Sequence, residues 1–101
     1  MNERISQGDI LNISKIRTPV LVVSKDFFNH TGMIIGCPVY ENGTADTLHL
    51  HIQGKNIEGF VHCEKMKLLD MNNRGYNKKD RVSMPDIMEV TDAIQSIFDY
   101  I

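Results

Sequence analysis

The stretch GFVHCEKMKLLD, residues 59–70, decides the fold because two short apolar runs enclose a polar interruption. We expect FVHC (60–63) to be a strand, and MKLLD (66–70) either to continue it or to form a sixth strand. Strict alternation would place Lys65 on the buried face, where an unpaired charge is costly, so the strand should end or bulge at this residue.

Further short strands are expected around this stretch, at a spacing of roughly ten residues. Their predicted ranges are 8–13, 19–24, 33–40 and 47–52. The Val-rich run at 19–24 is typical of a strand that is buried on both faces. Gly36 and Pro38 predict a bulge or a tight bend within 33–40. The polar segments 25–32 and 71–81 are predicted to be loops.

The last segment changes to a helical pattern. Ser83 can cap a helix whose first turn contains Pro85 and Asp86. An apolar stripe at helical spacing follows, formed by Ile87, Val90, Ile94, Ile97, Phe98 and Ile101. We therefore predict a mainly β fold with α, in which five to six strands form a small half-open barrel with a C-terminal helix, as one domain over residues 1–101.

Composition indicates an ordinary globular protein, with 42% hydrophobic and 24% charged residues. The formal net charge of −2 gives no overall argument for nucleic-acid binding. Two cysteines, with no CxxC motif and no hydrophobic export signal, favour reduced thiols and a cytoplasmic location. No apolar run approaches the roughly 20 residues that a membrane-spanning helix needs.

His62 and Glu64 are the candidate catalytic residues. On a regular strand both would point to one face, and Cys63 between them would point to the core. A carboxylate can take a proton from a hydroxyl, and a histidine can give one to a leaving oxygen near neutral pH. The alternative is a solvent-facing pair at an edge of the barrel, and the spacing alone favours it.

Basic residues are concentrated between residues 62 and 81, whereas residues 82–101 contain no lysine or arginine. The basic residues are Lys65, Lys67, Arg74, Lys78, Lys79 and Arg81. This segment could bind phosphates, with Tyr76 stacking on a base. Arg17, just before the second strand, could stabilise a charged phosphate by paired hydrogen bonds. The alternatives are a solvated loop and a plain surface arginine.

A metal site and a catalytic thiol are both disfavoured. His49 and His51 share one strand face, but a zinc site needs at least three ligands and no third is visible, so exposed polar positions are the better interpretation. Alternation places Cys63 and His62 on opposite faces, which argues against a thiol nucleophile. We expect no metal and no other cofactor.

The order of segments resembles the MazF/PemK (Kid) family of toxin ribonucleases, from about residue 7 to residue 101. GDI (8–10) resembles the opening of the family's first strand, and RTPVLVVS (17–24) its second strand. VHCEKMKLLDMNNRG (61–75) is similar to a PemK segment reading roughly VRCDQPRTIDMKARG. RVSMPDIMEVTDAIQSIF (81–98) is similar to the family's terminal helix.

The resemblance implies an SH3-like barrel of the CcdB/MazF type that forms a homodimer, binds an antitoxin and cuts single-stranded RNA without a metal. The cut leaves a 2′,3′-cyclic phosphate and a 5′-hydroxyl. Glu64 stands where PemK has its aspartate base, and His62 where PemK has an arginine acid. Arg17 lies one position before the family's arginine. The residues expected to contact RNA are Thr18, Tyr40, Lys65, Lys67, Arg74 and Tyr76.

Two departures from the family pattern leave other functions open. SKI (14–16) is nearly all that remains of a family loop that helps to close over RNA. Tyr40 replaces a threonine, and Glu41 replaces a small polar residue and would repel phosphate. The alternatives are a catalytically degenerate module that binds RNA or an antitoxin, and a CcdB-like gyrase poison.

Overall fold

The computed structural model describes residues 4–98. Its elements are β1 (Asp9–Ile13), β2 (Val20–Val22), α1 (Asp26–Asn29), β3 (Met33–Tyr40), β4 (His49–Gln53), β5 (Glu58–His62), the 3₁₀ turn η1 (Cys63–Lys65), β6 (Lys67–Asp70), β7 (Tyr76–Arg81) and α2 (Met84–Ile97). Within residues 4–98 no helix is long and apolar enough to cross a membrane.

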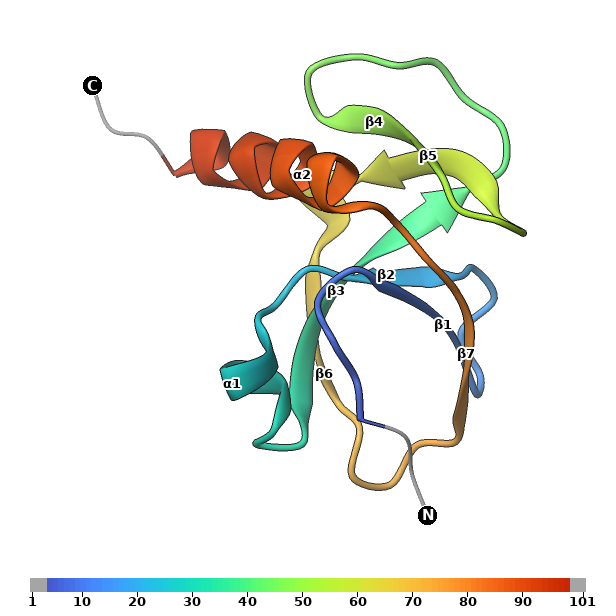
Figure 1. Cartoon of the computed structure of the whole chain (residues 1–101), viewed down its shortest axis with the longest axis vertical. Helices are drawn as coiled ribbons and strands as arrows, with labels where there is room; N and C mark the ends of the chain where they lie inside the picture. Colours follow the sequence, from blue (N-terminus) through green and yellow to red (C-terminus); the bar gives the residue numbers. More distant parts are fainter. Residues whose placement is uncertain (1–3, 99–101) are drawn as a thin grey trace.

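The strands form an antiparallel half-barrel in the order β4-β5-β3-β2-β1-β7, and β6 pairs with the first half of β3. β3 therefore belongs to two sheets, because its end at Val39 and Tyr40 pairs with β5. Its pairing with β6 ends at Gly36 and its pairing with β5 begins at Val39, so the strand passes from one sheet to the other across the segment where the bend was predicted (Figure 1). No side chain fits at Gly36, since a Cβ there would lie 2.4 Å from Cγ1 of Val20.

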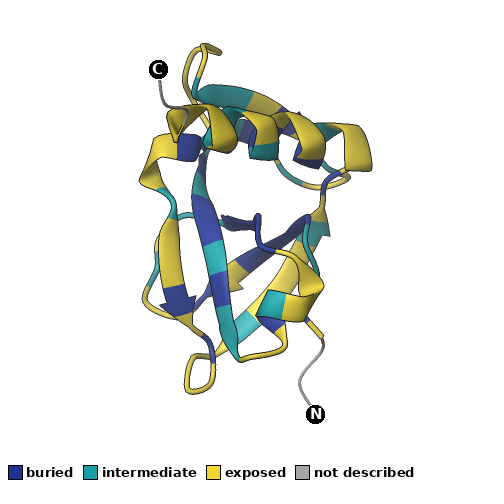
Figure 2. Ribbon diagram, turned by 90° about the vertical axis from the view of Figure 1, so that its left-hand side faces the viewer, coloured by how far each residue is buried: buried dark blue, intermediate teal, exposed yellow. Residues whose placement is uncertain are grey.

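Two apolar clusters pack on the opposite faces of β1 and β2. Ile10 and Leu21 belong to one cluster, whereas Leu11, Val20 and Val22 belong to the other. All of these side chains are buried, which confirms the prediction that the second strand is covered on both faces (Figure 2). The central strands are thus held by packing on both sides, and they form a rigid base for the segments at the rim.

The predicted cap of α2 is confirmed, since the Ser83 side chain accepts a hydrogen bond from the backbone N–H of Asp86. Val90 is buried in the core, but Ile97 and Phe98 are 41% and 65% exposed. The stripe predicted for this helix therefore packs on the core at Val90 but not at Ile97 and Phe98, because the last turn of α2 extends past the strands (Figure 1). Ile101, the last residue of the predicted stripe, lies outside the described residues.

Both segments that were predicted to be loops contain regular structure. Asp26–Asn29 form one short helix, and Tyr76–Arg81 form β7, which pairs with β1 along its whole length. The prediction for 71–81 was wrong because the side chains of this edge strand are mostly exposed and polar, so no apolar alternation marks it. Backbone hydrogen bonds to β1 supply the ordering that the side chains do not show.

Asp80 of β7 fixes the turn between β4 and β5. Its carboxylate accepts hydrogen bonds from three successive backbone N–H groups, those of Lys55, Asn56 and Ile57, at 3.1, 2.7 and 2.7 Å. Gly54, in the same turn, comes so close that an added Cβ would lie 2.2 Å from this carboxylate. The two ends of the half-barrel, β4–β5 and β7, are therefore joined through one side chain.

We expect Asp80→Ala to lower the free energy of unfolding by about 2 kcal/mol, because hydrogen bonds to a charged acceptor contribute roughly 1.5–3 kcal/mol and the turn N–H groups lose their partner. Urea denaturation measures the change. Asp92→Ala, at an exposed position of α2, is the control and should change stability by less than about 0.5 kcal/mol. If both variants are as stable as the parent, the turn does not depend on this carboxylate.

Candidate active site

Glu64 lies in a 3₁₀ turn rather than on a strand. β5 ends at His62, and η1 covers Cys63–Lys65 before β6 begins at Lys67. The prediction of strand alternation through 62–64 was therefore wrong, and the strand ends three residues before Lys65. The turn resolves the conflict seen in the sequence, because Cys63 is buried while Glu64 and Lys65 are both exposed.

Glu64 is hydrogen-bonded to His49 of β4, which was not expected in the site. Nε2 of His49 lies 2.8 Å from Oε2 of Glu64, and its Nδ1 lies 3.1 Å from Oδ2 of Asp46. The hydrogen bond to Glu64 and the charge of Asp46 raise the pKa of His49. The same bond lowers the pKa of Glu64. The pairing therefore favours an imidazolium at His49 beside a carboxylate at Glu64.

The ring of His62 is enclosed between two other rings. It stacks on His49, with centroids 3.9 Å apart, and it is tilted against Tyr40 at 4.4 Å. Its Nδ1 is buried and has no hydrogen-bond partner among residues 4–98. Burial, together with the nearby charge of His49, lowers the pKa of His62, so its neutral form predominates at neutral pH.

A groove of about 750 Å³ runs along the exposed side of Glu64. Four of the described charged residues that line it are basic, and Glu64 is the one acidic residue among them. The basic residues are Lys15, Lys65, Lys67 and Arg74. Nζ of Lys65 lies 5.1 Å from the centre of the Tyr40 ring. A groove with several cations and one carboxylate is suited to a substrate that carries several negative charges.

The structure gathers most of the predicted RNA contacts in this groove, but not all of them. Thr18, Tyr40, Lys65, Lys67 and Arg74 line it. Arg17 is exposed and is not among the lining residues, because the turn that precedes β2 directs Lys15 and Thr18 to the groove in its place. Tyr76 lines a different hollow, next to Asn72, and its ring packs on the core.

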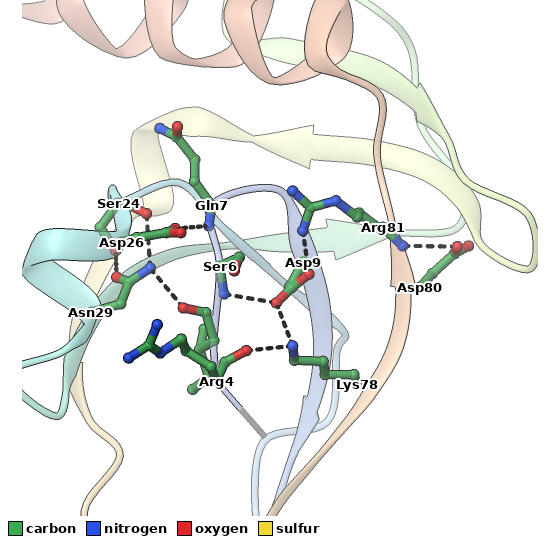
Figure 3. Close-up of polar contacts among 11 residues, drawn as sticks. Arg4, Ser6, Gln7, Asp9, Ser24, Asp26, Asn29, Lys78, Asp80 and Arg81 are labelled. Carbon is green, nitrogen blue, oxygen red and sulfur yellow. Dashed lines mark hydrogen bonds and ion pairs between the residues drawn. The ribbon is translucent and has the colours of Figure 1, made fainter. Parts of the chain in front are cut away.

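Part of the basic segment has a structural role. Lys78 and Arg81 of β7 both bind the buried carboxylate of Asp9, with N–O distances of 3.2 and 2.7 Å (Figure 3). Lys78 also donates to the backbone carbonyl of Arg4. The interpretation of 62–81 as one phosphate-binding loop is therefore corrected, since its last part is a strand that neutralises a buried acid.

Sequence reasoning missed His49 as a partner of Glu64. It paired His49 with His51, but in the structure the Nε2 of His51 lies 2.7 Å from Glu58, and His49 lies opposite His62 in the β4–β5 ladder. One signal could have found it: the alternating run at 47–52 is followed by a short polar turn containing Gly54 and then by the strand predicted at 60–63, an order that indicates a hairpin. Cross-strand neighbours in such a hairpin share a face.

Buried thiols are excluded from the chemistry of the groove. Burial raises the pKa of Cys37 to about 12 and that of Cys63 to about 11. Both side chains are fully buried in the apolar cluster between the sheet and α2. At neutral pH they are therefore protonated, and they act as small apolar residues of the core.

The chain matches a known protein family over most of its length. A model described as PemK-like, MazF-like toxin of type II toxin–antitoxin system matches residues 8–98. Comparison with curated protein sequences gives no match.

Solved structures share this fold over almost the whole chain. A chain of the MazE–MazF complex (Form II) from Deinococcus radiodurans has a TM-score of 0.86 at 19% identity, covering 99% of this chain and 100% of that one. An endoribonuclease from a mycobacterial species has a TM-score of 0.80 at 14% identity, covering 93% and 90%. An endoribonuclease bound to its cognate antitoxin, also mycobacterial, has a TM-score of 0.78 at 14% identity, covering 96% and 99%.

Proposed function

Since the chain belongs to the PemK-like, MazF-like toxins of type II toxin–antitoxin systems, we propose that it is an endoribonuclease that cuts single-stranded RNA at specific short sequences without a metal ion. One observation carries the proposal: the only acidic side chain that lines the described groove, Glu64, is an ionised carboxylate among four basic residues. A proton acceptor beside several phosphate ligands is what cleavage by the internal 2′-hydroxyl requires.

Glu64 is the proposed general base. It accepts the proton of the 2′-hydroxyl, the 2′-oxygen forms a bond to phosphorus, and the bond from phosphorus to the 5′-oxygen breaks. The products are a 2′,3′-cyclic phosphate and a 5′-hydroxyl. DNA lacks the 2′-hydroxyl and is therefore not a substrate. The low pKa of Glu64 keeps the carboxylate ionised well into the acidic range.

His62 is the proposed general acid, and His49 a positioning residue. Attacking and leaving oxygens lie on opposite sides of phosphorus, so a base and an acid that are hydrogen-bonded to each other cannot serve both. His49 is bonded to Glu64 at 2.8 Å and is excluded by this argument. His62 makes no such bond. It does not line the groove, so its ring must leave the stack between His49 and Tyr40 before its protonated form can donate to the leaving 5′-oxygen.

The basic side chains of the groove are the proposed phosphate ligands. Lys65 lies next to Glu64 in η1, and Lys67 and Arg74 extend the positive surface along the groove. Cations at these positions stabilise the additional negative charge of the phosphorane transition state. Tyr40, at the end of β3, offers a hydroxyl and a ring face to the RNA.

Binding through Lys67 can be tested by salt dependence. In a Glu64→Gln background, which prevents cleavage, Lys67→Ala should weaken binding of a labelled single-stranded RNA and make the log–log salt slope shallower by about 0.7. Lys79→Ala is the matched control, because Lys79 is exposed on β7 and does not line the groove. Fluorescence anisotropy at several salt concentrations gives both slopes, and equal slopes would remove Lys67 from the interface.

The proposed partners are RNA, a cognate antitoxin and a second copy of the chain, and the proposed location is the bacterial cytoplasm. An antitoxin with an acidic, partly disordered segment suits the basic groove. Met84 and Met88 of α2, together with Phe98 just after it, are exposed apolar side chains that provide a surface for protein contacts.

Analysis of cleavage products tests the proposed activity. The protein is incubated with a long single-stranded RNA in EDTA, and the ends of the fragments are identified by mass spectrometry. Discrete fragments with 2′,3′-cyclic phosphate and 5′-hydroxyl ends support the proposal. If the folded protein binds this RNA and leaves it intact, the chain is a binding module instead.

A further inference from the structure

The residues around Glu64 form a second chemical arrangement that RNA cleavage does not require. His49 comes from β4, His62 from the end of β5 and Glu64 from η1, and one ligand-type atom of each lies within 4.8 Å of the others. Among residues 4–98 no other group of three histidine, cysteine or acidic side chains comes together in this way. Two imidazoles and a carboxylate are a common ligand set for zinc.

Asp46 prepares His49 for metal binding. Its carboxylate accepts a hydrogen bond from Nδ1 of His49, which directs the other ring nitrogen, Nε2, towards Glu64. A carboxylate that orients a histidine through its second nitrogen is the usual arrangement behind metal-binding histidines. Two backbone N–H groups, of Leu48 and His49, fix the Asp46 carboxylate in turn. The orientation of His49 is therefore built into the turn that precedes β4.

His62 supplies the second nitrogen ligand. Its ring is held between His49 and Tyr40, and its Nδ1 is buried without a hydrogen-bond partner among the described residues. The site therefore contains an imidazole that has not satisfied its hydrogen-bonding capacity, next to a histidine that is already oriented.

The distances fit a tetrahedral ion after a limited movement. Ligand atoms about 2.0–2.1 Å from zinc lie about 3.3 Å from one another in a tetrahedron. Nε2 of His49 and Oε2 of Glu64, at 2.8 Å, need to separate slightly. The distances from the His62 nitrogen to these two atoms, which are at most 4.8 Å, need to come to the same value. Since the two rings are stacked at 20°, one of them must turn before both nitrogen lone pairs can converge.

We propose that His49, His62 and Glu64 bind one divalent transition-metal ion of the zinc type, and that the bound ion inhibits RNA cleavage. The inhibition rests on the proposed function, because the ion occupies the carboxylate assigned as base and the imidazole assigned as acid. On binding, the proton on Nε2 of His49 passes to solvent, and the nitrogen lone pair then binds the ion. Mg²⁺ is not expected to bind at these three side chains, since it prefers sites made of oxygen ligands and two of the three ligands are nitrogen atoms.

Binding is measured first, without RNA. Zn²⁺ is titrated against a chromophoric chelator, and the melting temperature of the protein is recorded with and without Zn²⁺. The parent chain should bind one ion and melt at a higher temperature with Zn²⁺, since a ligand of the folded state stabilises it. His49→Gln should lower the affinity at least tenfold and abolish the rise in melting temperature.

The chain offers a matched control two residues along the same strand. His51 is also bonded to a glutamate, Glu58, at 2.7 Å, but no third ligand lies near this pair among the described residues. His51→Gln should therefore bind Zn²⁺ as the parent does. Equal loss in both variants, or no Zn²⁺-dependent rise in the parent, would overturn the proposal. The protein is also loaded with Co²⁺ and its absorption spectrum is recorded. If the spectrum shows no thiolate-to-cobalt charge-transfer band, binding of the metal by Cys37 or Cys63 is excluded.

Inhibition is measured separately. Adding Zn²⁺ to the EDTA-free enzyme should stop RNA cleavage, and EDTA should restore it, with half-inhibition near the dissociation constant from the binding titration. Faster cleavage with Zn²⁺ would refute the inhibition. The two proposals fail in different ways: Zn²⁺ binding without any nuclease activity refutes the proposed function and the inhibition but leaves the metal site, and nuclease activity without Zn²⁺ binding refutes the metal site but leaves the proposed function.

Discussion

Replacing Glu64 by glutamine is expected to lower the rate of RNA cleavage by about 10²–10⁴-fold, the usual loss when a positioned general base is removed. The amide keeps the size of the side chain but cannot accept the 2′-hydroxyl proton. RNA binding should persist or become tighter, because the groove loses its one acidic lining residue. Single-turnover cleavage and anisotropy with the same RNA separate the two effects.

Glu58→Gln is the control for this experiment. Glu58 is a similarly exposed glutamate that is bonded to a histidine, but it lies outside the groove. Its replacement should leave cleavage unchanged. If Glu64→Gln cleaves within threefold of the parent while its thermal unfolding is normal, the carboxylate is not the base and the proposed mechanism is wrong.

A bell-shaped pH profile with its maximum on the acidic side of pH 6.5 is expected for kcat/KM, measured in EDTA. The proposed reaction needs ionised Glu64 and protonated His62. The pKa of Glu64 lies below its ordinary value, so the base form persists to low pH and is lost only as pH falls through that lowered value. The pKa of His62 is also lowered, so the acid form is lost early as pH rises.

The alkaline side of the profile should fall about tenfold per pH unit above the pKa of His62. His62→Gln should reduce kcat/KM by about 10²–10⁴-fold and remove this dependence. In the RNA complex the negative phosphate favours the imidazolium, so the fall in kcat should lie at higher pH than the fall in kcat/KM. A flat profile up to pH 8 in the parent would exclude His62 as the acid.

The fold could largely be predicted from the sequence, because its strands are marked by apolar residues. The run at 33–40 matches β3 in both bounds, and the buried run at 19–24 contains β2. β7 was missed because its side chains are polar, and only the partner strand β1 determines it. Ile97 and Phe98 belong to the predicted apolar stripe but are exposed, because periodicity gives the face of a helix and not the length of the sheet beneath it.

The candidate site could be predicted only in part. Glu64 was a candidate from the residue pattern, a family resemblance gave it the role of base, and the structure places it in the groove. The reason given for its partnership with His62 was wrong, since a turn and not a strand brings the two together. The bond from His49 to Glu64 depends on the register between β4 and β5 and on the geometry of η1. Neither this register nor the geometry of the turn can be read from a single sequence, because both depend on which strands pair.

The double membership of β3 limits how this protein can change during evolution. Pro38 and Tyr40 line the groove, whereas Cys37 and Val39, which alternate with them, belong to the core. Any substitution at Pro38 or Tyr40 that displaces the backbone of β3 therefore also displaces Cys37 and Val39 in the core, where vacant space is scarce. New substrate preferences should therefore arise by substitution of exposed groove residues such as Lys67 and Arg74. Related proteins should differ at these positions while the residues of β3 stay the same.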